Sequence, residues 1–346
     1  MGTLEDLRGR VESLIRERTS SAATVTAVVP LSGGACQDNV RIDVTLEGPL
    51  GTERRFVLRS DAASSLPGSL GRAAEYVVIE AVGNAHVRTP KVQWLTRDLV
   101  REGAGSFFMD WLDGVAIGRK IVGDASLAEA RTKLPGELAD ELAKIHSITP
   151  ETHRSILRGG RNPDPAVSPV RTTLSMCRTM IDALDVSRPA MEIILSWLEQ
   201  NAPSREEVVL VHGDYRTGNF LVTPAGLNGV LDWEFARWGA PQEDIAWLCM
   251  RDWRFGKLDQ PVGGFAQREP FYRAYEKASG RRIDPVTIHY WEVAGNLWWS
   301  AGCVKQAARY FTGLNRDIEL IAIGRRAAEM EWEALRLIEQ GPGKRS

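Results

Sequence analysis

The feature that most constrains this chain is the segment 211–234, which reads VHGDYRTGNFLVTPAGLNGVLDWE. Asp214 follows a His-Gly pair, Asn219 comes five residues later, and Asp232 ends an apolar run. The turn 224–228 reverses the chain between two strand-like runs, which favours a hairpin that returns Asp232 to the side of Asn219. Hard oxygen ligands of this kind suit Mg2+. The pattern therefore predicts one acid–base carboxylate beside two metal ligands, the set that phosphoryl transfer from ATP requires.

The order H-G-D-x4-N followed by D-W-E resembles the catalytic loop and metal-binding segment of the aminoglycoside phosphotransferase and choline kinase family. The resemblance implies an α+β, bilobal protein-kinase-like fold that phosphorylates small molecules. It implies a small β-rich nucleotide-binding lobe over residues 1–112 and a larger, mainly helical catalytic and acceptor-binding lobe over 113–346. By the same resemblance ATP and Mg2+ are used, Asp214 accepts the proton of the attacking hydroxyl, and Asn219 and Asp232 hold the metal.

A loop that contains Gly33 and Gly34 joins the first two strand-like runs, 24–30 and 40–46. The backbone N–H groups of such a loop can approach phosphate oxygens. The spacing is not G-x-G-x-x-G, however, and a plain hairpin loop explains it equally well. We expect these glycines to cover the phosphates chiefly because of the downstream motif.

The third strand-like run, 55–59, ends in Arg59, where protein kinases carry the lysine that reaches the phosphates. Arginine keeps the charge but presents a planar fork. The chain is similar here to a bacterial branch related to the kinase region of acyl-CoA dehydrogenase fusion proteins, which also carries arginine. The resemblance implies that Arg59 pairs with Glu75 in the helical stretch 72–85, with Glu80 as the alternative. An exposed arginine at a strand end is the alternative.

The strand-like run 106–111 leads into Met109-Asp110-Trp111-Leu112 and then a glycine. This ending resembles the hinge of kinases, in which backbone groups bind the adenine edge. The resemblance implies that the carbonyl of Asp110 and the N–H of Leu112 contact adenine, and that Met109 lines the pocket. A core strand followed by a turn is the alternative.

The segment after Asp232 carries the residues from which we expect acceptor binding. Glu234 could contact a metal-bound water or a substrate amine, or be a surface carboxylate. Three arginines mix with tryptophans in this part of the chain: Arg251, Arg254 and Arg309. That composition suits an acceptor with an apolar and an anionic part, such as a hydroxyacyl-CoA or a hydroxy acid. A polycationic aminoglycoside or amino-sugar, which needs an acidic pocket, is the alternative.

Most tryptophans in this part of the chain are expected to be core residues. The resemblance also gives Asp244 and His146 structural roles, with Asp244 holding the catalytic loop.

Composition narrows the remaining classes of protein. The 346 residues are 43% hydrophobic with a net charge of −2, which gives no basic surface field for nucleic acid. No apolar stretch approaches the roughly 20 residues that span a bilayer. The acidic, periodic N-terminus does not read as a secretory signal. We expect a cytoplasmic monomer or homodimer whose partner is a small-molecule hydroxyl acceptor.

A pseudokinase-like module that binds nucleotide without turnover is the alternative from another class. The intact Asp214, Asn219 and Asp232 favour the enzyme. A protein kinase is disfavoured because the D-F-G and A-P-E segments are absent.

Overall fold

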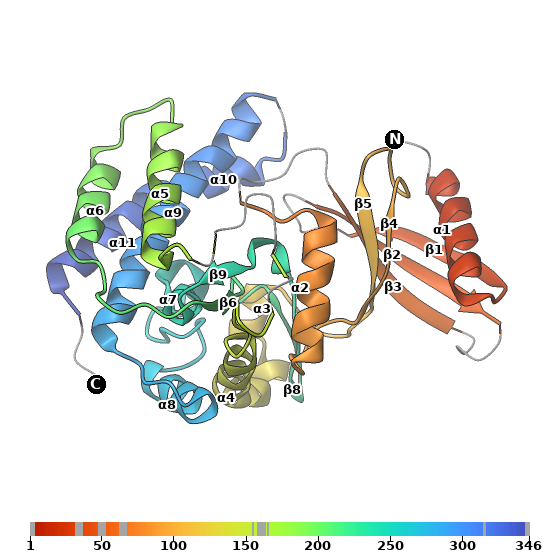
Figure 1. Ribbon diagram of the computed structural model, residues 1–346, viewed down its shortest axis with the longest axis horizontal. Coiled ribbons are helices and arrows are strands. Elements are labelled where there is room, and N and C mark those ends of the chain that lie inside the picture. Colours follow the sequence, from red (N-terminus) through yellow and green to blue (C-terminus); the bar gives the residue numbers. More distant parts are fainter. Residues whose placement is uncertain are drawn as a thin grey trace. The chain divides into compact units, whose positions relative to one another are not determined.

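The computed structural model describes residues 4–31, 37–47, 53–61, 68–153, 156–157, 164, 166–313 and 316–342. The chain forms two compact units (Figure 1). Unit 1 contains Met1–Asp113 and Gly229–Ala236, and unit 2 contains Gly114–Asn228 and Arg237–Ser346. A mixed α/β architecture with an antiparallel sheet and many helices confirms the predicted fold class. The segment Gly229–Ala236, which the sequence prediction placed in the larger lobe, packs with the N-terminal residues in unit 1.

Unit 1 is built on a five-stranded sheet in the order β1-β2-β3-β5-β4, in which every neighbouring pair is antiparallel. Its strands are β1 (Ala23–Pro30), β2 (Gln37–Leu46), β3 (Glu53–Asp61), β4 (Val92–Arg97) and β5 (Gly105–Asp110). Its helices are α1 (Leu4–Thr19), α2 (Arg72–Asn84) and the 3-10 turn η2 (Trp233–Phe235).

The α-helices α1 and α2 cover opposite faces of the sheet. Phe108 of β5 belongs to the buried cluster that also contains Leu7, Val11 and Ile15 of α1. Its neighbour Phe107 makes an edge contact with Tyr76 of α2, with ring centroids 5.8 Å apart. Adjacent residues of a strand point to opposite faces, so α1 and α2 must lie on different sides.

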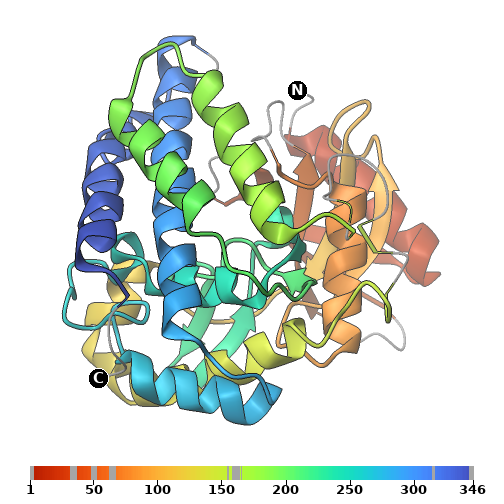
Figure 2. The same cartoon turned by 60° about the vertical axis from the view of Figure 1, so that its left-hand side comes forward.

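Unit 2 is mainly helical, and the long helix α9 packs against α5, α6, α7, α10 and α11 (Figure 2). The helices of unit 2 are α3 (Gly118–Gly123), η1 (Ala125–Leu127), α4 (Ala128–Ile145), α5 (Pro169–Asp182), α6 (Pro189–Gln200), α7 (Pro241–Cys249), η3 (Arg251–Arg254), α8 (Arg268–Ser279), α9 (Pro285–Phe311), α10 (Glu319–Gly324) and α11 (Ala327–Gln340). Two short sheets join β6 (Val209–Val211) to β9 (Arg237–Gly239) and β7 (Phe220–Thr223) to β8 (Gly226–Val230). None of the described helices is long and apolar enough to cross a membrane.

Candidate active site

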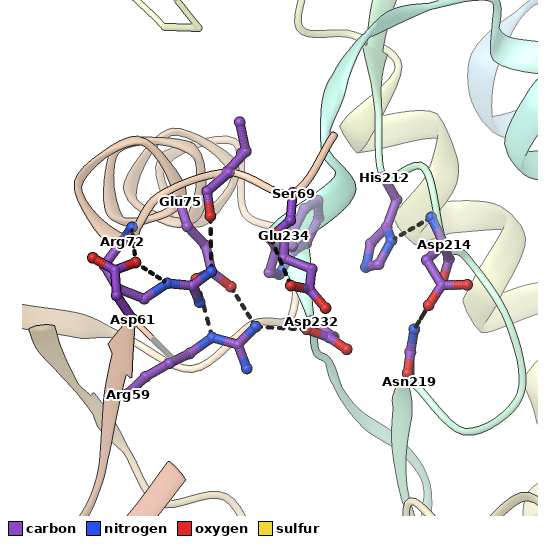
Figure 3. A network of polar contacts seen from close by, with 12 residues as sticks. Arg59, Asp61, Ser69, Arg72, Glu75, His212, Asp214, Asn219, Asp232 and Glu234 are labelled. Carbon is purple, nitrogen blue, oxygen red and sulfur yellow. Dashed lines mark hydrogen bonds and ion pairs between the residues drawn. The ribbon is translucent and has the colours of Figure 1, made fainter. Parts of the chain in front are cut away.

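A buried ion pair connects the sheet of unit 1 to helix α2 (Figure 3). Arg59 lies opposite Phe107 in the β3–β5 register, so its side chain stands on the face that α2 covers. Its Nε donates to Glu75 Oε2 at 3.0 Å, and its Nη2 lies 2.9 Å from Glu75 Oε1. Such two-point contact is the strongest form of a guanidinium–carboxylate pair. Glu80, the alternative partner, is exposed.

A second arginine holds the same glutamate. Arg72, in the first turn of α2, is only 1% exposed and contacts Glu75 through Nη1. It also donates Nε to Asp61 Oδ1 at 3.3 Å and Nη2 to the Leu70 carbonyl at 2.8 Å. Asp61 Oδ1 also accepts the backbone N–H of Arg72 at 3.2 Å, in place of the cap that the preceding glycine cannot provide. This network fixes the glutamate that faces Arg59.

Asp232 adds a third group to Arg59. Its Oδ1 accepts from Arg59 Nη2 at 2.6 Å, while its side chain remains 31% exposed. The residue has a left-handed backbone, with φ of 69°, which aspartate tolerates better than most residues. This turn ends β8 and begins η2.

Glu234 lies two residues further and is 5% exposed. Its Oε2 accepts from Ser69 Oγ at 2.9 Å, and its carbonyl accepts from Leu70 N at 2.7 Å. Burial raises the pKa of Glu234 to about 7, and the neighbouring charge of Asp232 adds to the shift. It is therefore a buried, hydrogen-bonded carboxyl and not a surface carboxylate.

The charged groups of this part of unit 1 are unbalanced. The arginines Arg59 and Arg72 face four carboxyl groups: Asp61, Glu75, Asp232 and Glu234. Burial acts against the charge of Arg59, but Glu75 and the other carboxylates outweigh it and raise the pKa of the guanidinium. Carboxylate oxygens suit a hard divalent cation, but among the described residues no three His, Cys, Asp or Glu side chains are arranged to hold one by themselves.

In unit 2, the loop between β6 and β7 presents Asp214 in a ring of donors. Trp247 Nε1 donates to Oδ1 at 2.8 Å, and Asn219 Nδ2 donates to Oδ2 at 2.7 Å. Arg216 Nε lies 3.0 Å from Oδ1 and 3.2 Å from Oδ2. Asn219 Nδ2 also donates to the Asp214 carbonyl at 2.9 Å. The two hydrogen bonds of Nδ2 fix the side-chain amide, and with it the direction of Asn219 Oδ1.

A fully buried carboxylate on α7 holds this loop from behind. Asp244 accepts the backbone N–H of His212 at 2.7 Å and that of Gly213 at 2.9 Å. His146 Nε2 lies 3.3 Å from the same carboxylate, and its Nδ1 lies 2.8 Å from Tyr275 Oη. Burial works against the ionised form, but His146 and His212 outweigh it and lower the pKa of Asp244. The structural roles expected of Asp244 and His146 match these contacts.

Tryptophans surround the base of the loop. The guanidinium carbon of Arg216 lies 4.5 Å from the ring centroid of Trp253. Trp247, Trp253 and the partly buried Trp299 contact one another in the same cluster. Trp233, Trp238, Trp247 and Trp253 are all less than 9% exposed, which confirms the prediction that most of these rings are core.

The three arginines proposed for acceptor binding contact different neighbours. Arg254 donates Nη2 to the Cys249 carbonyl at 2.7 Å and Nη1 to the Leu258 carbonyl at 3.2 Å. Arg251 lies over the exposed ring of Trp332, 5.6 Å from its centroid. Arg309, on α9, donates to Gln306 Oε1 at 2.9 Å.

The predicted adenine-binding residues lie where β5 leaves the sheet of unit 1. Met109 pairs with Val57, and Asp110 pairs with Phe56. Leu112 follows the strand and is half-buried. Gly33 and Gly34 lie outside the described residues.

Sequence reasoning missed three residues that contact the candidate site: Arg72, Arg216 and Trp247. One signal was available, because Asp244 and Trp247 are three residues apart on α7 and therefore share a face of the helix. The position of Arg216, two residues after Asp214, gave no indication that its side chain would turn back onto the carboxylate.

Comparison with known families agrees with this geometry. Residues 27–280 match the model of the phosphotransferase enzyme family, and they make up well over half of the chain. The chain therefore belongs to the phosphotransferase enzyme family.

Two curated relatives are proteins of Mus musculus. The chain is 30% identical to acyl-CoA dehydrogenase family member 10 of Mus musculus over 205 residues. This aligned region is 57% of this chain and 18% of that protein. It is 40% identical to acyl-CoA dehydrogenase family member 11 of the same species over 207 residues, and this aligned region is 56% of this chain and 25% of that protein. The match thus spans a quarter or less of either relative.

Solved structures share the fold. A putative aminoglycoside phosphotransferase from Ralstonia eutropha JMP134 has a TM-score of 0.71 at 22% identity, over 95% of this chain and 98% of that one. The choline kinase LicA from Streptococcus pneumoniae, solved in complex with AMP, has a TM-score of 0.57 at 16% identity, over 95% and 99% of the two chains.

Proposed function

We propose that this protein is an ATP- and Mg2+-dependent phosphotransferase that moves the γ-phosphate to a hydroxyl of a small molecule. The observation that carries this proposal is the carboxylate of Asp214, which Trp247 and Asn219 orient at the end of a loop that Asp244 anchors. A carboxylate fixed in this way can orient an attacking hydroxyl and accept its proton. Membership of the phosphotransferase family supports the same reaction class.

Asn219 and Asp232 are the proposed ligands of Mg2+. Because Asn219 donates its amide nitrogen to Asp214, the side-chain oxygen is the atom left to meet a cation. Asp232 is bound to Arg59 through Oδ1 and keeps part of its side chain exposed. Both ligands offer oxygen atoms, as Mg2+ requires. When bound, the metal neutralises charge on the phosphate oxygens.

Arg59 is the proposed contact to the nucleotide phosphates, held by Glu75 as the kinase pattern requires. Backbone groups of Asp110 and Leu112, with Met109 beside them, are proposed to bind adenine, and Gly33 and Gly34 to cover the phosphates. The AMP complex of the structurally similar choline kinase supports a nucleotide site in this fold.

For the acceptor we propose a hydroxyacyl-CoA or a hydroxy acid. Arg251 and Arg309, and the position of Arg216 beside Asp214, favour an acceptor with anionic or carbonyl oxygen over a polycation. The names of the animal relatives point to acyl-CoA chemistry. An aminoglycoside or amino-sugar remains the second candidate, which the structural similarity to a putative aminoglycoside phosphotransferase favours.

The test is ATP consumption across a panel of hydroxyl compounds that includes hydroxyacyl-CoAs, hydroxy acids and aminoglycosides. Asp214→Ala is expected to lower turnover by roughly 10²–10⁴-fold, the scale of a positioned acid–base group. The affinity for ATP should change little, because this carboxylate serves the acceptor. The proposal is refuted if the wild-type protein binds ATP but consumes none with any compound of the panel. The protein would then be the pseudokinase-like module.

A further inference from the structure

The carboxylate of Asp214 has no lone pair left for an incoming hydroxyl. A carboxylate offers about four acceptor positions, two on each oxygen. Trp247 and Arg216 share Oδ1, at 2.8 and 3.0 Å, and Asn219 and Arg216 share Oδ2, at 2.7 and 3.2 Å. A group that must accept a proton from the acceptor therefore has to lose one donor first.

Arg216 is the donor that can leave. Trp247 and Asn219 are 8% and 4% exposed, and Asn219 is fixed by a second bond to the Asp214 carbonyl. The side chain of Arg216 is 25% exposed, and its single Nε–H is divided between the two oxygens. Shared bonds of this kind are longer and weaker than the two that flank them.

The surroundings of Arg216 give the guanidinium a defined place and leave one end of it open. It stacks on the face of Trp253, and a side chain at position 218 would bring its Cβ within 2.6 Å of Arg216 Nη1. Gly218, with φ of 112°, thus leaves room for the guanidinium. Within the described part of the chain Nη1 donates to the Thr217 carbonyl and Nη2 makes no hydrogen bond. An open N–H beside a fixed cation is a natural contact for an anionic oxygen.

We propose that Arg216 is a positioning residue that occupies the base in the resting protein and is drawn off it by an anionic oxygen that arrives with the substrates. The inference rests on the proposed function, since it assigns Asp214 as the base. Taking a guanidinium from a carboxylate is unfavourable unless another anion replaces it. If the acceptor supplies that oxygen, water meets a closed base and hydrolysis of ATP is suppressed; if the nucleotide supplies it, the base opens when ATP binds. The anionic oxygen can come from the terminal phosphate of the nucleotide or from the acceptor.

The position of Arg216 can be followed by NMR of the arginine Nε–H groups in 15N-labelled protein. The resonance that disappears in Arg216→Lys is that of Arg216. The resonance that disappears in Arg178→Lys is that of Arg178, a surface arginine of the same unit that serves as the control. Two probes separate the sources of the anion: Mg2+ with AMP-PNP, and 3-hydroxybutyrate. The resonance of Arg216 is expected to shift with at least one probe, and the resonance of Arg178 with neither.

A kinetic readout tests the closure itself. If the acceptor supplies the anion, Arg216→Met is expected to raise ATP hydrolysis without acceptor severalfold relative to transfer, whereas Arg178→Met should leave this ratio unchanged. If Arg216→Lys keeps the wild-type ratio of ATP hydrolysis to transfer, the positive charge at position 216 is what closes the base.

Thermal stabilisation by Mg2+ with AMP-PNP distinguishes the two ways to fail. Stabilisation with an unmoved Arg216 resonance under both probes overturns the inference and leaves the proposed function intact. A chain that Mg2+ and AMP-PNP do not stabilise overturns both. A shift with AMP-PNP alone, or with 3-hydroxybutyrate alone, supports the inference and names the source of the anion.

Discussion

Replacing Asp244 by alanine is expected to release the loop that carries Asp214. The carboxylate of Asp244 is completely buried and accepts two consecutive backbone N–H groups, those of His212 and Gly213. Alanine leaves both donors, and the ring of His146, without this acceptor in a site closed to water. Unsatisfied buried donors destabilise a fold more than the loss of the bond alone.

The magnitude follows from the short bonds. Hydrogen bonds to a charged group contribute roughly 1.5–3 kcal/mol each, so two of them predict a loss of about 3–6 kcal/mol in the free energy of unfolding. The desolvation of the carboxylate works in the other direction. The pKa of Asp244 is nevertheless lowered, which means that the favourable contacts of the ionised form exceed its burial penalty. A net loss is therefore expected above the pKa of the unfolded aspartate.

Urea unfolding measures this loss as a shift of the midpoint at constant slope. Asp140→Ala, which removes an exposed carboxylate from α4 in the same unit, is the matched control and should shift the midpoint little. Turnover should fall together with stability, because Asp214 loses its anchored backbone. A loss below about 1 kcal/mol, a typical value for one neutral hydrogen bond, would show that the loop does not depend on Asp244.

Three further results are expected. If Asp232 holds the metal, ATP should raise the melting temperature far more with Mg2+ than with EDTA, and Asp232→Ala should abolish the difference; an unchanged Mg2+ effect would place the metal elsewhere. Burial raises the pKa of Glu243 from 4.5 to about 7, against the opposing charge of Arg237, so its contribution to stability is complete below pH 4.5 and is lost as the pH rises through 7. Up to about 3 kcal/mol should disappear between pH 5 and 8 in the wild type but not in Glu243→Gln, as thermal unfolding at each pH would record, and equal slopes would contradict this. Arg251→Glu or Arg309→Glu should raise the KM of an anionic acceptor and leave that of ATP near its original value, since attraction becomes repulsion; unaffected acceptor kinetics would remove both residues from the acceptor site.

Local patterns were enough to predict the strands and the positions of several charged groups. The alternation in RFVLR places Phe56 and Leu58 in the cluster under α1 and sends Arg59 to the other face. The motif H-G-D-x4-N likewise placed Asp214 and Asn219 in one short loop, and the structure adds a direct contact between them at 2.7 Å. Both results depend on short segments whose geometry is set by the backbone.

Contacts made by long side chains across the fold could not be predicted. Arg254 was predicted to bind the acceptor, and nothing in the sequence indicated that its guanidinium would also donate to the carbonyls of Cys249 and Leu258. Arg216 turns onto Asp214 because Trp253, far along the sequence, offers its ring face. A flexible arginine takes the conformation that its surroundings provide, and those surroundings are set only by tertiary packing.

The return of Gly229–Ala236 into unit 1 limits how this chain can be divided. A fragment that stops at Asp113 would lose the carbonyl of Glu234 that binds Leu70 N, and the Trp233 side chain that donates to Thr89 Oγ1 at 3.1 Å. It would also leave Arg59 with Glu75 but without Asp232. A self-standing unit 1 would need these eight residues supplied through a new linker, as in a circular permutant. A chimera of two relatives with a single crossover after residue 113 would take Arg59 from one parent and its partner Asp232 from the other.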